Sequence, residues 1–88
     1  MNVRYFAAAR AAAGLEEESF HLAEGATVAD LLEAVLAVQR PGPPSGTPPL
    51  PRILSRSSFL LNEVAVRDHS VVLKADDVVD ILPPFAGG

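Results

Sequence analysis

One amphipathic helix constrains the fold of this 88-residue chain more than any other feature of its sequence. Thr27 can cap a helix that ends near Gln39 and Arg40, because Pro41 cannot continue it. The apolar residues within this segment recur at the spacing of a single helical face: Val28, Leu31, Leu32, Val35 and Leu36. A short helix with one apolar face must bury that face against other structure, and we expect it to lie on a sheet.

Segments on both sides of this helix have the residue pattern of β-strands. Residues 2–6 are rich in Val, Tyr and Phe, and residues 16–22 alternate between two faces. Later strands are expected at residues 57–61, 64–66 and 78–82, with Asn62 and Glu63 in a tight turn. This order predicts an α+β roll, a mixed sheet of about four to five strands around one main helix. The first and last strands are expected to be parallel neighbours in the middle of the sheet.

Length and composition predict one folded domain followed by a tail. Hydrophobic residues make up 49% of the chain, which suffices for one core but leaves no room for a second. We expect the folded domain at residues 1–82. Within it, the proline-rich residues 41–51 are expected to form a surface loop, and the alanine-rich residues 7–13 a helical turn or a bulged connection. Residues 83–88 are expected to form an extended tail.

The composition argues against several kinds of functional site. The chain has no cysteine and only two histidines, His21 and His69, so no disulfide, cysteine nucleophile or metal site is expected. A net charge of −4 without a basic patch argues against nucleic-acid binding. No apolar stretch is long enough for a membrane span and no signal peptide is evident, so we expect a cytoplasmic protein. The acidic residues Asp76, Asp77 and Asp80 are interpreted as surface groups.

The last six residues predict where the chemistry of this chain takes place. They are Pro83, Pro84, Phe85, Ala86, Gly87 and Gly88. The two prolines favour an extended path away from the sheet, and the phenylalanine is an apolar anchor. The tail then tapers to glycine, a shape that suits entry into a narrow tunnel in a partner. Its terminal carboxylate can form a mixed anhydride with AMP, which sulfide or persulfide would convert into a thiocarboxylate.

These residues resemble the MoaD/ThiS family of ubiquitin-like sulfur carriers, which includes the small subunit of molybdopterin synthase. The likeness covers nearly the whole chain. Residues 3–10 resemble the family's opening strand and turn, residues 27–32 its helix start, and residues 61–63 its internal turn. Residues 73–88 resemble its last strand and its Pro-Pro-x-x-Gly-Gly ending. Asp76 departs from the family's usual glycine, and the proline-rich loop is longer than expected.

The resemblance implies a β-grasp fold and a function as a sulfur donor without catalysis by the isolated chain. Gly88 would be adenylated by an ATP-dependent, ubiquitin-activating-like enzyme and converted to a thiocarboxylate. The tail would then enter the large catalytic subunit and donate sulfur to the dithiolene of molybdopterin, within a heterotetramer. Phe6, Leu82 and Phe85 match apolar contacts with these partners. The chain itself would bind no cofactor, because the activating partner uses the ATP.

Other interpretations stay open at this point. A related carrier could serve thiamin or cysteine biosynthesis, although Pro83 and Pro84 favour the molybdopterin branch. A protein of another class, a ubiquitin-like modifier or a plain interaction module, could also carry such a tail. An isopeptide bond from Gly88 to a target lysine would identify the modifier, whereas activity that survives deletion of the two glycines would identify the module.

Overall fold

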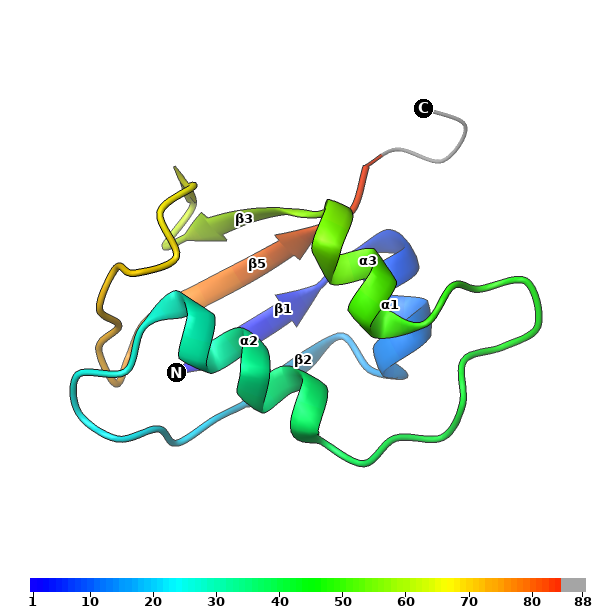
Figure 1. Cartoon of the computed structure of the whole chain (residues 1–88), viewed down its shortest axis with the longest axis horizontal. Coiled ribbons are helices and arrows are strands. Elements are labelled where there is room, and N and C mark those ends of the chain that lie inside the picture. The colour runs from blue at the N-terminus through cyan, green and yellow to red at the C-terminus, as the bar shows by residue number, and fades with distance from the viewer. Residues whose placement is uncertain (85–88) are drawn as a thin grey trace.

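The computed structural model describes residues 1–84, and this part of the chain contains five strands and three helices (Figure 1). The elements are, in order, β1 (Asn2–Tyr5), α1 (Ala7–Ala13), β2 (Glu17–Ser19), α2 (Val28–Ala37), α3 (Leu50–Arg56), β3 (Ser58–Leu61), β4 (Val64–Val66) and β5 (Val78–Leu82). The predicted α+β class is confirmed. The helices and the sheet share one hydrophobic core.

The strands of the described residues form one five-stranded sheet in the order β2-β1-β5-β3-β4. β1 and β5 are parallel, with Val3 opposite Val79 and Tyr5 opposite Ile81, and these four side chains are buried toward the helices. The prediction that the first and last strands are central parallel neighbours is therefore confirmed. β5 also pairs with β3, so both of its edges are hydrogen-bonded. The strand that leads to the tail is thereby held on both sides.

The main helix, α2, has the predicted start but ends earlier than predicted. Thr27 and Asp30 form a reciprocal capping box, in which each side chain accepts a hydrogen bond from the other residue's backbone N–H. The helix stops at Ala37, and Val38 is already extended, whereas the sequence predicted an end near Gln39 and Arg40. Arg40 accounts for the earlier end, because its Nη2 donates to a carbonyl of the last helical turn.

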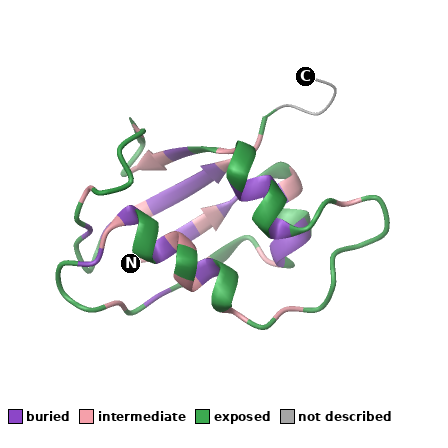
Figure 2. Cartoon of the chain, in the orientation of Figure 1, coloured by how far each residue is buried: buried purple, intermediate pink, exposed green. Residues whose placement is uncertain are grey.

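The helix α3 is the main element that the sequence analysis did not predict. It begins at Leu50, inside the segment predicted as a surface loop, so that loop ends before residue 50. Pro51 is tolerated in the first helical turn, where its missing N–H would have no intrahelical acceptor. Leu50, Ile53 and Leu54 are buried in the core, while most of residues 41–49 are exposed (Figure 2). None of the helices within residues 1–84 is long and apolar enough to cross a membrane.

The β3–β4 hairpin turn is connected to the start of β5 by one side chain. Asn62 and Glu63 both have positive φ angles, 50° and 71°, as the predicted tight turn requires. The Asn62 amide donates to Asp77 (2.9 Å) and accepts from the Val78 N–H (2.9 Å). Asp77 also accepts from the Lys74 N–H and is buried, so its interpretation as a surface group was wrong. These hydrogen bonds, first the one from Asn62, lower the pKa of Asp77.

A nearly buried arginine joins three parts of the chain. Arg40 Nη2 donates to Glu18 Oε1 (2.7 Å), to the Val35 carbonyl (3.1 Å) and to the Tyr5 hydroxyl (3.3 Å). Its Nη1 donates to the carbonyl of Ala13 (3.4 Å), and the Tyr5 hydroxyl donates to Glu18 (2.7 Å). Only 11% of the Arg40 side chain and 18% of the Glu18 side chain are exposed. We refer to Arg40, Glu18 and Tyr5 as the arginine cluster.

Candidate functional site

The last strand delivers the chain to one end of the molecule. At that end Ile81 pairs with Tyr5 of β1, and Leu82 pairs with Ser58 of β3. Pro83 is half-buried and Pro84 is exposed, and the chain leaves the sheet there, while the N-terminus lies at the other end of β1 (Figure 1). The predicted tail residues 85–88 lie outside the described residues. The tail therefore starts from a strand that is fixed on both edges.

The face of the sheet that points away from the helices forms the candidate docking surface. Strand residues alternate between the two faces, so Leu60, Asp80 and Arg4, which are neighbours in the register, lie on this open face. Leu82 lies on it as well, two residues beyond Asp80. Leu60, Val78 and Leu82 are only partly buried, and Ala65 is exposed. An apolar sheet surface beside the tail suits contact with another protein.

Phe6 adds a large apolar side chain at the same end of the sheet. Tyr5 and Ile81 are the last pair between the parallel strands β1 and β5. Phe6 follows Tyr5 and Leu82 follows Ile81, so both residues lie at the same end of these two strands. Phe6 is the N-cap residue of α1 and its side chain is exposed. The structure therefore brings the predicted contact residues Phe6 and Leu82 to one end of the sheet, where Phe6 is exposed and Leu82 is half-buried. The third, Phe85, lies outside the described residues.

An ion pair lies at the centre of the open face. Arg4 donates two hydrogen bonds to Asp80, from Nε to Oδ1 (2.5 Å) and from Nη2 to Oδ2 (2.8 Å). The Asp80 side chain is only 6% exposed, so its interpretation as a surface carboxylate was wrong, whereas the Arg4 side chain is 41% exposed. The hydrogen bond and charge of Asp80 raise the pKa of Arg4. This pair fixes β1 against β5 from the open side.

A small hollow lies between this face and α1. It has a volume of about 340 Å³ and is lined in part by Arg4, Phe6 and Arg10. Arg10 forms an exposed ion pair with Glu16 across the hollow's rim (2.7 Å). The exposed Phe6 ring is thus bordered by charged groups of both signs. An apolar side chain inside a polar rim is the arrangement found in protein–protein interfaces.

Sequence reasoning missed Arg4 and Leu60 as members of the candidate surface. Both could have been found by extending the alternation of strand residues from β5 to its two neighbours, because Asp80 lies opposite Arg4 and Leu60 in the register. For Leu60 this step requires knowing that β3 is the neighbour of β5, and the residue patterns alone did not predict that pairing.

One of the two histidines, His69, lies away from this surface, on the loop after β4. His69 packs against Phe59, with ring centroids 5.2 Å apart and ring planes at 82°. Within residues 1–84, no cluster of three or more His, Cys, Asp or Glu side chains has an arrangement that could hold a metal ion.

Comparison with known proteins places the whole chain in one group. The model of the ThiS family matches residues 3–88. A molybdopterin synthase sulfur carrier subunit from Chlamydomonas reinhardtii is 36% identical over 89 aligned residues, which span 100% of this chain and 98% of that protein.

Solved structures share the same fold. A putative molybdopterin converting factor subunit 1 from Pyrococcus furiosus is similar with a TM-score of 0.71 and 27% identity, over 96% of this chain and 95% of that one. SAMP1 from Haloferax volcanii has a TM-score of 0.78 and 24% identity, over 100% of this chain and 98% of that one. The ubiquitin-like β-grasp fold that the sequence implied is confirmed by these likenesses.

Proposed function

The chain belongs to the ThiS family, and on that basis we propose that it is the sulfur-carrying small subunit of a molybdopterin synthase. The observation that carries the proposal is the full-length similarity to a molybdopterin synthase sulfur carrier subunit. The structure supports it in two ways. β5 is paired with β1 up to Ile81 and with β3 up to Leu82, and an open sheet face with Leu60, Val78 and Leu82 around the Arg4–Asp80 pair lies beside it.

In this proposal the reactive group is the carboxylate of Gly88. An ATP-dependent adenylating enzyme joins the carboxylate to AMP and releases pyrophosphate. A hydrosulfide ion then attacks the acyl carbon and displaces AMP, which leaves a thiocarboxylate and releases the proton of the hydrosulfide. When the sulfur passes to the precursor of the molybdopterin dithiolene, water supplies the oxygen that restores the carboxylate. Catalysis comes from the partners. The chain supplies an acyl group that accepts a sulfur atom, releases it and returns to the carboxylate.

The partner surface in this proposal is the open sheet face together with the tail. The tail, from Pro83 to Gly88, spans at most about 20 Å when extended, so it reaches a buried active site only if the sheet end docks closely. Phe6 and Leu82 provide apolar contact on the folded part, and Phe85 on the tail. The same surface serves the adenylating enzyme and the large catalytic subunit in turn, and the complex with the latter is a heterotetramer.

The decisive experiment measures the intact mass of the chain. Incubation with its adenylating enzyme, ATP and sulfide is expected to add the oxygen-to-sulfur mass difference, and fragmentation should assign it to Gly88. A variant that lacks Gly87 and Gly88 is the matched control and should keep its mass. An unchanged mass of the full chain, with an enzyme that is active on another carrier, would contradict the proposal.

A second experiment tests the docking surface separately from the chemistry. Leu82→Ala is expected to weaken binding to the large subunit by about tenfold or more, because apolar anchors near an interface centre contribute most of its affinity. Val64→Ala is the matched control, since Val64 is an exposed apolar residue of the edge strand β4. Equal affinities of the two variants would remove the open face from the proposal.

The alternatives from the sequence give different results in the same assays. A carrier for thiamin or cysteine biosynthesis would form the thiocarboxylate but would not copurify with a large molybdopterin synthase subunit. A protein modifier would instead yield Gly88 in isopeptide linkage to lysine. Fold similarity to SAMP1 alone does not distinguish these functions from the proposed one.

A further inference from the structure

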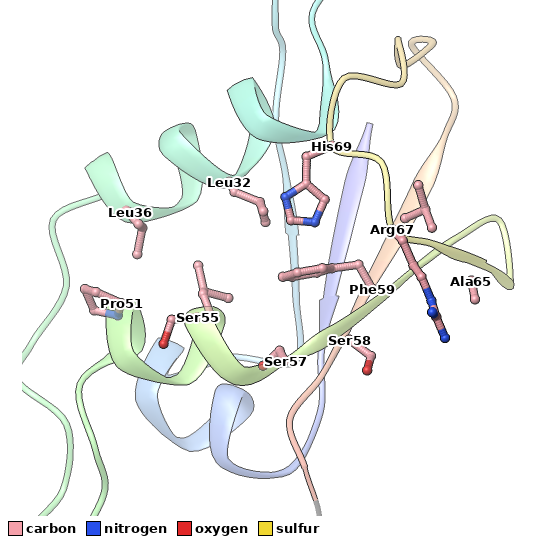
Figure 3. A pocket seen from close by; sticks show the side chains of 12 residues that line it. Leu32, Leu36, Pro51, Ser55, Ser57, Ser58, Phe59, Ala65, Arg67 and His69 are labelled. Carbon is pink, nitrogen blue, oxygen red and sulfur yellow. The ribbon is translucent and has the colours of Figure 1, made fainter.

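A groove on the helix side of the molecule is not used by the proposed function. It has a volume of about 590 Å³ and lies between α2, α3 and the strands β3 and β4. Figure 3 shows Leu32 and Leu36 of α2 along one wall, Pro51 and Ser55 of α3 along another, and Phe59 of β3 between them. The volume is within the range of pockets that bind small molecules.

Two residues of the apolar face of α2, Leu32 and Leu36, are not fully buried in the core and line the groove. Val28, Leu31 and Val35 of α2 are buried in the core, but Leu36 remains 43% exposed. Leu36 lines the groove together with Leu54 of α3. The wall therefore presents apolar surface that the described part of the chain leaves accessible.

One side chain that lines this apolar groove carries a permanent positive charge, that of Arg67. Arg67 and His69 lie on the loop after β4, and the rings of His69 and Phe59 pack in a T-shaped arrangement (Figure 3). Among the ion pairs of residues 1–84, which involve Arg4, Arg10 and Arg40, none includes Arg67. In a chain with a net charge of −4, an arginine beside an apolar groove that has no carboxylate partner among residues 1–84 favours an anionic occupant.

Hydroxyl groups at the α3 end give the groove a second polar feature. Ser55 Oγ donates to the Arg52 carbonyl (2.7 Å) and Ser57 Oγ donates to the Ile53 carbonyl (2.7 Å). Each hydroxyl donor is therefore occupied, while each oxygen can still accept a hydrogen bond. The groove thus offers acceptors at the α3 end and the Arg67 cation at the β4 side, which matches the amide N–H groups and an acidic side chain of a peptide.

We propose that this groove binds a peptide segment of a partner protein that combines apolar side chains with a carboxylate. The apolar side chains pack between Leu36 and Phe59, and the carboxylate lies beside Arg67. This site does not depend on the proposed sulfur chemistry, because no tail residue contributes to it.

The test selects binders from a phage-displayed library of random short peptides on the immobilised full chain. Enriched peptides are expected to combine apolar residues with Asp or Glu. In spectra of the ¹⁵N-labelled chain, the synthetic peptide should shift the amide signals of Leu36, Phe59 and His69. Arg67→Glu should weaken binding roughly tenfold by exchanging attraction for repulsion, and Leu36→Ala about fivefold through lost apolar contact.

Arg52→Glu is the matched control, because it makes the same charge change on an exposed residue of α3 that does not line the groove. It should leave peptide affinity unchanged. The proposal is overturned if no peptide is enriched, if enriched peptides are basic or lack acidic residues, or if the shifts fall on Arg4 and Leu60 of the open face. Self-association that covers the groove with a second copy would overturn it as well.

Discussion

Replacing Arg40 by methionine should destabilise the domain far more than replacing an exposed arginine. The substitution keeps much of the apolar stem but removes the guanidinium that contacts Glu18, Tyr5 and two helix carbonyls. Breaking a buried ion pair from one side typically costs about 3–5 kcal/mol, since the remaining charge is left without a partner.

The expected loss is somewhat smaller here. Glu18 retains 18% exposure and still accepts a hydrogen bond from the Tyr5 hydroxyl, so we expect Arg40→Met to lower the free energy of unfolding by about 2–4 kcal/mol. For a domain of this size the unfolding midpoint would fall by roughly 10–25 °C. Urea unfolding followed by circular dichroism measures the free energy, and a thermal scan measures the midpoint.

Two further variants make this expectation refutable. Arg10→Met removes the exposed pair with Glu16, whose side chains are 58% and 70% exposed, and should cost less than about 1 kcal/mol. Adding Glu18→Gln to Arg40→Met should recover part of the loss, because the unpaired carboxylate is then gone. Equal losses for Arg40→Met and Arg10→Met, or no recovery in the double variant, would refute the reasoning.

Three other predictions test separate parts of the structure. Tyr5 is the only tyrosine; burial, and then its hydrogen bond to Glu18, raise its pKa, so tyrosinate absorbance should stay absent near pH 10 and appear only where the protein unfolds. The lowered pKa of Asp77 contributes stability that is present above the pKa of the unfolded chain, about 3.8, and is lost as the pH falls through the lower pKa of the folded state; Asp77→Asn should flatten the acid side of the stability profile measured by urea unfolding. Thr27→Ala removes the capping box and should lower the free energy of unfolding by about 1 kcal/mol, whereas Thr27→Ser keeps a capping hydroxyl and should retain most of the stability of the original protein.

The elements that were predicted correctly are those whose pattern is local. The apolar spacing of Val28, Leu31 and Val35 and the cap at Thr27 identify α2, and the parallel pairing of β1 with β5 follows from the order of elements. Helix α3 was missed because prolines at 49 and 51 suggest a loop, although a proline is acceptable in a first helical turn.

The burial of charged residues could not be predicted from local pattern. Asp80 lies on the open face, yet Arg4, 76 residues earlier in the sequence, covers it. Arg40 follows the last turn of α2, and nothing in the residue pattern around it predicts its contacts with Glu18 and Tyr5. Such pairs depend on which strands become neighbours, and alternation within one strand does not contain that information. For the same reason, the sequence did not predict that Leu60 belongs to the open face.

The parallel arrangement of β1 and β5 has a mechanical consequence. The N-terminus and the start of the tail lie at opposite ends of two adjacent strands, so a force that stretches the molecule between them slides β1 along β5. Their interstrand hydrogen bonds, with the Arg4–Asp80 bonds across them, must then rupture together and not one after another. A domain built in this way withstands tension between its N-terminus and the start of its tail better than one whose strands open one hydrogen bond at a time.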